Sequence, residues 1–202
     1  MNELPPEVEI HPLTPERWRD LEKLFGPNGA MGGCWCMWFR QTNKDYEKNK
    51  GERNRQLFKA VVENGSQPGV LAYFNGRPVG WCAVAPRSAY PRYKTSRIAK
   101  PLDDQPVWVI SCLFIAKDHR GSGLMTRLID AAAAHAAGCG ASIVEAYPVD
   151  TQGKTADSFL YHGTRTAFAR AGFSEVARRS PHRPVMRKMV SRSNRRTDGL
   201  EG

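Results

Sequence analysis

The segment 113–125, LFIAKDHRGSGLM, constrains the fold more than any other part of the sequence. It closes an unbroken apolar, β-rich run over residues 107–116, which predicts a strand buried on both faces. A polar turn with two glycines follows, and then an apolar stripe of helical period. Gly121 and Gly123 let the backbone approach a ligand closely, and the N–H groups of a helix start favour an anion such as a pyrophosphate. Arg120 adds a fixed positive charge, although a glycine helix cap without a ligand is the alternative interpretation.

Two other phosphate-binding turns fit this segment less well. A Walker A loop ends in Gly-Lys-Ser/Thr, which the segment lacks. A Rossmann fingerprint departs at its last glycine, where Thr126 stands, and Glu145 lies about twenty residues further on. In that fold, however, the glycine turn follows the strand directly, whereas residues 117–120 intervene here. The sequence shows no further βα alternation that would build a nucleotide-binding sheet.

A third pattern fits. The segment resembles the acetyl-CoA motif of the GNAT superfamily of N-acyltransferases, Arg/Gln-x-x-Gly-x-Gly/Ala, which follows a strand reading apolar-x-apolar. Here the motif is Arg120-x-x-Gly123-x-Met125, preceded by Leu113-x-Ile115. Met125 replaces a small residue, which would crowd a bound phosphate.

Segments elsewhere are similar to the same family in the same order. Asn75-Gly76 between two β-rich runs predicts a hairpin with a type I′ turn, and Pro78-Val79-Gly80 follows it. Residues 168–173, FARAGF, are similar to that family's last helix and its Gly-Phe pair. The resemblance covers roughly residues 7–190. It implies an α+β fold, with a mixed, mostly antiparallel central sheet of six or seven strands and about four flanking helices in a single domain.

The expected elements agree with that order. Strands are expected at 7–12, 70–74, 77–84, 107–116, 141–147, 173–178 and 184–190, and helices at 14–25, 45–64, 121–137 and 164–171. Thr14 is expected to cap the first helix. Residues 85–106 form a long irregular connection with several prolines and basic residues, which is often functional. We expect one domain over 1–190 and a disordered basic tail over 191–202.

The resemblance implies that acetyl-CoA is the cosubstrate and that no metal takes part. Its acetyl group would pass to a primary amine of a small molecule by direct attack, through a tetrahedral intermediate. The strand before the turn splays from its neighbour in this family, and by position the Leu113 N–H would donate to the oxyanion. The residues expected to bind the cosubstrate are Leu113, Phe114, Ile115, Arg120, Gly121, Ser122, Gly123, Leu124 and Met125.

The sequence identifies the catalytic acid and base less clearly than the cosubstrate site. Many relatives carry a Tyr four residues before the Gly of Gly-Phe, where this chain has Phe168, which has no proton to give. Tyr161 and His162 lie just upstream and could donate instead, or they are ordinary loop residues. Glu145 is the candidate base, since a buried carboxylate would have a raised pKa, so that Glu145→Gln should lower kcat/KM by about 10²–10⁴. The alternative is a structural, salt-bridged Glu145.

The acceptor pocket and the partners are predicted from composition and from analogy with relatives. Some tryptophans must be core, and others should line the acceptor pocket; the candidates are Trp35, Trp38, Trp81 and Trp108. A net charge of +10 suggests an anionic ligand and argues mildly against basic protein tails as acceptors. No nucleic-acid-binding pattern accompanies the C-terminal arginines, so we expect no nucleic-acid partner. A homodimer, a protein acceptor and a non-catalytic acyl-CoA-binding regulator stay open.

The remaining features exclude other classes of protein. Five cysteines without a CxxC pair predict reduced thiols, and Cys34-Trp35-Cys36 lacks a second Cys/His pair at zinc-site spacing. No apolar run approaches 18 residues, so we expect no transmembrane helix. The start has neither a basic nor an apolar segment of a signal peptide, which favours a cytoplasmic protein.

Overall fold

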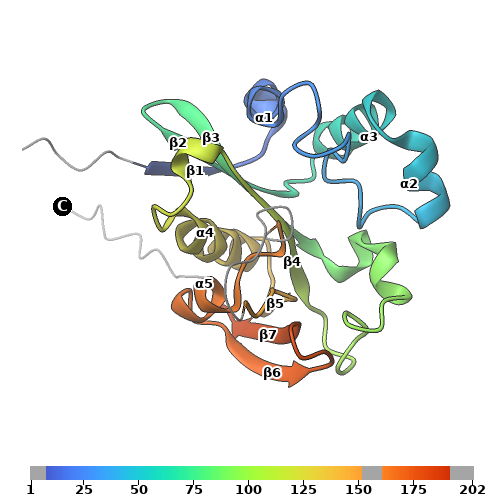
Figure 1. The fold of residues 1–202 in the computed structure, drawn as a ribbon, viewed down its shortest axis with the longest axis vertical. Helices are drawn as coiled ribbons and strands as arrows, with labels where there is room; N and C mark the ends of the chain where they lie inside the picture. The colour runs from blue at the N-terminus through green and yellow to red at the C-terminus, as the bar shows by residue number, and fades with distance from the viewer. Residues whose placement is uncertain (1–7, 152–160, 192–202) are drawn as a thin grey trace, which may run out of the picture.

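The computed structural model describes residues 8–151 and 161–191, which build one seven-stranded mixed sheet (Figure 1). The strand order is β1-β2-β3-β4-β5-β7-β6. β4 and β5 are parallel, and every other neighbouring pair is antiparallel. Parallel neighbours need a crossover, and the helix α4 supplies it. The predicted α+β fold with a mostly antiparallel sheet is confirmed.

The elements have the following bounds. The strands are β1 Val8–Pro12, β2 Gly69–Phe74, β3 Arg77–Pro86, β4 Trp108–Ile115, β5 Ile143–Ala146, β6 Ser174–Arg178 and β7 Pro184–Met189. The helices are α1 Trp18–Phe25, α2 Asn43–Asn49, α3 Glu52–Glu63, α4 Leu124–Gly138 and α5 Arg165–Arg170, with 3-10 turns at Pro15–Arg17, Arg87–Ala89, Pro91–Lys94 and Lys117–His119.

Local sequence signals explain several of these boundaries. Asn75 and Gly76 both have positive φ, 48° and 72°, as a type I′ turn requires, so the predicted hairpin is confirmed. The helix expected over 45–64 is two helices, because Gly51, with φ 87°, interrupts it. Thr14 makes no side-chain capping bond, contrary to expectation, and a 3-10 turn precedes α1 instead. The described residues therefore form five α-helices where four were expected.

Strand alternation divides the core between the two faces of the sheet. On β3, Cys82 and Val84 pack on the side of α4 and α5, while Trp81 and Ala83 pack on the side of α1 and α3. A third cluster joins the 85–107 connection to the β4, β5 and β7 ends. Alternation thus fixes the face of the sheet on which each side chain of the central strands packs, including those near the site described below.

The central strand changes partners halfway along its length. β4 pairs with β5 over residues 108–110, whereas it pairs with β3 as far as Ile115. Opposite β3, the register shifts between Ala83 and Val84, so that Ser111 is an extra residue on β4. The bulge lies where the pairing of β4 with β5 ends. Beyond it, β4 stays paired with β3 but no longer with β5.

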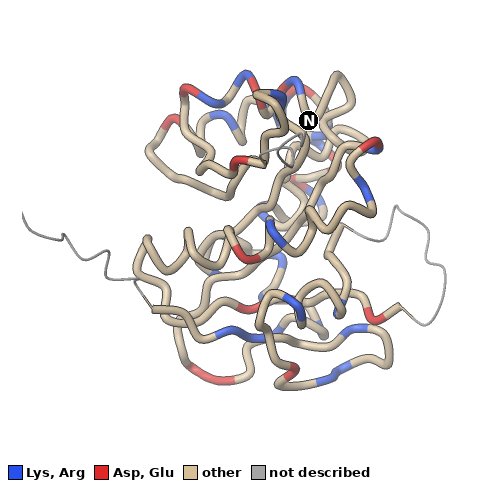
Figure 2. Tube along the Cα trace, turned by 90° about the vertical axis from the view of Figure 1, so that its left-hand side faces the viewer, with Lys and Arg blue, Asp and Glu red and all other residues tan. Residues whose placement is uncertain are grey.

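Acidic and basic residues are interspersed over the trace (Figure 2). In the described part of the chain, no helix has both the length and the apolar character needed to cross a bilayer. The tail predicted to be disordered lies outside the described residues, except for Ser191.

Candidate functional site

A groove of about 960 Å³ runs from the free edge of β4 to the start of α4. Eight of the nine predicted cosubstrate-binding residues line it; these are Leu113, Phe114, Ile115, Arg120, Gly121, Gly123, Leu124 and Met125. The ninth, Ser122, donates from its hydroxyl to the His119 carbonyl over 2.8 Å and so braces the turn. The sequence motif therefore folds into one wall of this groove.

Backbone groups of β4 face this groove. The Ala116 N–H donates to the Val79 carbonyl of the neighbouring chain segment over 2.9 Å. Since antiparallel residues alternate between bonded and non-bonded pairs, Leu113 and Ile115 direct their backbone groups away from β3. The Arg120 guanidinium accordingly reaches the Ile115 carbonyl, over 3.2 Å from Nε. The Leu113 N–H thus points toward the edge from which β5 has diverged.

The turn before α4 has the backbone that an anion site needs. Gly121 and Gly123 adopt φ values of 77° and 82°, and a Cβ added to either would meet no atom within 4 Å, so the turn surface is open. Gly123 is the N-cap of α4, and its helix end has no side-chain cap. Uncapped N–H groups at the positive end of a helix favour a phosphate.

Met125 forms part of the wall beside this turn. The Thr164 hydroxyl approaches its Sδ to 4.0 Å, and the same hydroxyl accepts from the Ala167 N–H over 3.2 Å to cap α5. The methionine side chain therefore lies toward α5, which is a direction that the motif itself could not reveal.

Three thiols line the groove. Cys34 and Cys36 come from the loop after α1, and Cys112 comes from β4. The Trp81 indole N–H donates to the Cys36 sulfur over 3.0 Å. The pKa of the Cys112 thiol is raised, first by its hydrogen bond with Cys36 and then by burial. Sequence reasoning missed the gathering of these thiols because it depends on contacts between distant segments.

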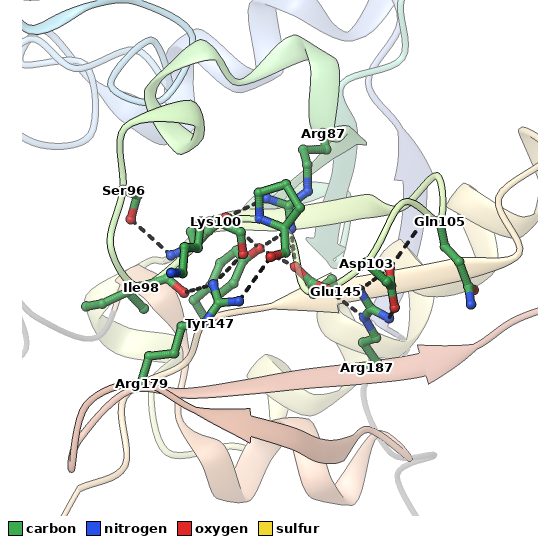
Figure 3. A network of polar contacts seen from close by, with 12 residues as sticks. Arg87, Ser96, Ile98, Lys100, Asp103, Gln105, Glu145, Tyr147, Arg179 and Arg187 are labelled. Atoms are coloured by element: carbon green, nitrogen blue, oxygen red, sulfur yellow. Dashed lines mark hydrogen bonds and ion pairs between the residues drawn. The ribbon is translucent and has the colours of Figure 1, made fainter.

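Glu145 lies in a buried ion cluster that we call the Glu145 cluster, formed with Arg87, Arg187, Tyr147 and Asp103 (Figure 3). The Glu145 side chain is fully buried, and its Oε2 accepts from the Arg187 Nε over 2.6 Å. Its Oε1 accepts from both the Arg87 guanidinium and the Tyr147 hydroxyl. Glu145 is not among the groove-lining residues. The geometry corresponds to the salt-bridged alternative, because both carboxylate oxygens already accept hydrogen bonds from arginine or tyrosine.

The two loop candidates for the acid differ in position. Tyr161 lines the groove, and burial raises the pKa of its hydroxyl. His162 stacks on Tyr161 with ring centroids 4.2 Å apart and lines an adjoining pocket instead. Burial, with the charge of Arg183, lowers the pKa of His162 to about 3, so its imidazole is neutral. Phe168 is fully buried and packs edge-on against Phe173, 5.1 Å away.

The four tryptophans considered for the acceptor separate into two groups. Trp38 lines both the groove and the adjoining pocket. Trp35 and Trp81 are buried in the core beneath α1 and α3, and Trp108 packs against the core on the α4 side. The aromatic content could not tell these positions apart, because the division depends on which layer each ring occupies.

No metal centre is formed by the part of the chain that the structure describes, where no three His, Cys, Asp or Glu side chains gather suitably. All five cysteines lie in that part and are free thiols.

A splayed central strand, a glycine-rich turn and an uncapped helix match the acyl-CoA N-acyltransferase fold. A sequence model of the Acetyltransferase (GNAT) family matches residues 35–162. The chain belongs to the GNAT acetyltransferase family. No curated protein sequence matches it.

Solved structures share the fold at low sequence identity. A GNAT-family acetyltransferase from Streptococcus pneumoniae is similar with a TM-score of 0.51 and 14% identity, covering 92% of this chain and 100% of that one. One from Listeria monocytogenes has a TM-score of 0.53 and 10% identity over 91% and 95% of the two chains. The polyamine N-acetyltransferase of Drosophila melanogaster has a TM-score of 0.55 and 10% identity over 91% and 100%.

Proposed function

We propose that the protein transfers the acetyl group of acetyl-CoA to a primary amine of a small molecule, which attacks the thioester directly. The observation that carries this proposal is the continuity of the groove from the free β4 edge to the anion turn. Such a shape suits a ligand with an extended arm and a pyrophosphate. Family membership supports the same cosubstrate.

Each role falls to a group on the groove wall. The backbone N–H groups of the turn and of the α4 N terminus, with Arg120, hold the phosphates. The Leu113 N–H donates to the developing oxyanion. Tyr161, which keeps its proton because burial raises its pKa, donates to the departing thiolate. Glu145 is left out as a base because two arginines and Tyr147 occupy its oxygens, so the amine loses its proton to water in the groove.

The alternatives are weighed by the same features. A non-catalytic acyl-CoA-binding regulator would need no proton donor, and Tyr161 on the groove wall favours an enzyme. Basic protein tails are disfavoured as acceptors because the chain carries a net charge of +10. The Drosophila protein acts on polyamines, which is a precedent for a small-molecule acceptor on this fold.

The test is thiol release from acetyl-CoA in the presence of a panel of small primary amines. Gly123→Asp adds a strained Cβ and a negative charge at the anion turn, so the affinity for acetyl-CoA should fall at least about 100-fold. Gly140→Asp is the matched control, because Gly140 has φ 92° with equally open surroundings at the other end of α4. Tyr161→Phe should lower the rate about 10-fold, since a thiolate leaves with little help. Equal affinities in the two glycine variants would contradict the assigned site, and no thiol release with any amine would contradict the activity.

A further inference from the structure

A second pocket of about 230 Å³ adjoins the groove, and the two share Trp38 and Phe39 as walls. Its other walls come from the 85–107 connection, the β5 end and the residue that precedes β7. We call it the arginine pocket, after Arg92 and Arg183. His162 also lines it, and no residue of the anion turn does.

Some nitrogens of the two arginines that line this pocket have no hydrogen-bond partner in the part of the chain that the structure describes. Among the described residues, Arg92 Nε and Nη2 and Arg183 Nε are buried and make no hydrogen bond. No Asp or Glu is found among the described residues that line the pocket. Burial lowers the pKa of both guanidiniums, yet arginine stays charged in proteins. Both residues are half-buried, but these three nitrogens are shielded from water, so an anion that accepted their hydrogen bonds would be stabilised in the pocket.

The guanidinium of Arg92 is held in a fixed plane. Its Cζ lies 3.7 Å from the ring centroid of Trp38, which is stacking distance. Such a contact engages the face of the guanidinium, and the N–H groups on its edge stay free to pair with a carboxylate. The site is therefore preorganised for a planar anion.

The remaining walls are uncharged, and most of them are aromatic; the others are Ser96, Ile98 and Ala99. Phe39 packs against Tyr93 and His162, with ring centroids at 4.9 Å and 5.6 Å, and Tyr93 packs against Tyr147 at 5.4 Å. The cavity is smaller than the usual range for drug-sized ligands, so one planar ring with a short acidic arm suits it.

We propose that the arginine pocket binds the carboxylate of the amine acceptor, so that the substrates are amines that carry a carboxylate next to a single ring, as aromatic amino acids do. This inference rests on the proposed function, because the shared walls Trp38 and Phe39 let a molecule seated there present its amine to the groove. The chemistry of recognition is a carboxylate between Arg92 and Arg183, over aromatic walls.

The test measures binding without turnover. Phenylacetate and its neutral isostere phenylacetamide are titrated calorimetrically into the full chain, with no acetyl-CoA present. The acid should bind at least about 10-fold more tightly than the amide, since hydrogen bonds to charged groups are the stronger ones. Arg92→Gln and Arg183→Gln should each weaken acid binding at least about 10-fold, while Arg92→Lys keeps part of it.

Arg97→Gln is the matched control, because Arg97 is an exposed arginine of the same connection outside the pocket lining. It removes the same charge and should leave acid binding unchanged. Thermal melts of each variant show whether it is folded. No binding of phenylacetate, equal binding of acid and amide, or equal losses in Arg97→Gln and Arg183→Gln would overturn the pocket assignment.

A separate assay keeps the two proposals apart. Thiol release is compared for phenylalanine and phenethylamine, which differ by the carboxylate. Preference for phenylalanine supports the inference, and preference for phenethylamine overturns it. Binding of phenylacetate without thiol release from any amine would overturn the proposed activity and leave the pocket standing.

Discussion

Two pairs of arginines have Tyr147 as a neighbour, and they differ in whether their guanidiniums are paired with carboxylates. In the Glu145 cluster, Arg87 and Arg187 meet a fully buried carboxylate, and Arg187 also pairs with Asp103 over 2.6 Å (Figure 3). In the arginine pocket, Arg92 and Arg183 keep buried nitrogens without a hydrogen-bond partner among the described residues. Tyr147 contributes its hydroxyl to the first and its ring to the second.

This difference suggests different roles. The arginines of the Glu145 cluster stabilise the fold, whereas those of the arginine pocket are proposed to bind a ligand. A buried carboxylate with two guanidiniums is neutralised within the chain, so it fixes the 85–107 connection against β5 and β7. A guanidinium without a carboxylate partner forms no such link between segments, and its partial removal from water costs free energy. The Glu145 cluster should therefore respond to substitution through stability, and the arginine pocket through binding.

The largest expected effect is in the Glu145 cluster. Glu145→Gln keeps the shape but leaves Arg87 and Arg187 with a neutral partner, so the free energy of unfolding should fall by about 3–5 kcal/mol. Urea unfolding measures it. Glu175→Gln is the control, because Glu175 pairs with Arg165 and Arg178 near the surface and should lose much less. Equal losses in the two variants would remove the distinction between the cluster and ordinary surface pairs.

A smaller effect should appear with pH on the pocket side. An ordinary histidine titrates near pH 6.5, whereas burial and the charge of Arg183 lower the pKa of His162 to about 3. Between these values the unfolded chain binds more protons than the folded one, so stability falls as the pH falls. The free energy of unfolding should drop by about 1–2 kcal/mol between pH 7 and pH 5.

His162→Gln should remove most of that slope, because the variant has no imidazole to protonate. Urea unfolding at several pH values makes the comparison, and this window lies above the range in which the carboxylates titrate. A slope that survives unchanged in His162→Gln would show that a different group is responsible.

Local patterns predicted the parts of the fold that depend on neighbouring residues. Asn75-Gly76 specified its turn through φ alone, and the 113–125 segment specified a strand, an anion turn and a helix. The eight motif residues on the groove wall follow from that continuity. Gly51, which splits one predicted helix into two, also carried a local signal in the sequence.

Long-range side-chain pairing could not be predicted in this way. Glu145 meets Arg87 and Arg187, which lie 58 and 42 positions away, and no period in the sequence encodes such a meeting. Trp38 and Trp35 stand three positions apart, yet one lines the groove and the other is buried in the core. The arginine pocket could not be predicted for the same reason. Arg92 precedes the glycine turn in the sequence and Arg183 follows it, so only the fold brings them together.

The most direct test of the account compares Arg183→Gln with Arg187→Gln by urea unfolding. The two arginines are four positions apart around the start of β7, and the same charge is removed in both variants. Arg187→Gln should lower the free energy of unfolding by about 3 kcal/mol, because it breaks pairs with Glu145 and Asp103. Arg183→Gln should leave the free energy of unfolding unchanged or raise it, because it removes a half-buried arginine whose Nε has no hydrogen-bond partner among the residues that the structure describes. The opposite ranking, or equal losses, would contradict the distinction between charges that hold the fold and charges that await a ligand.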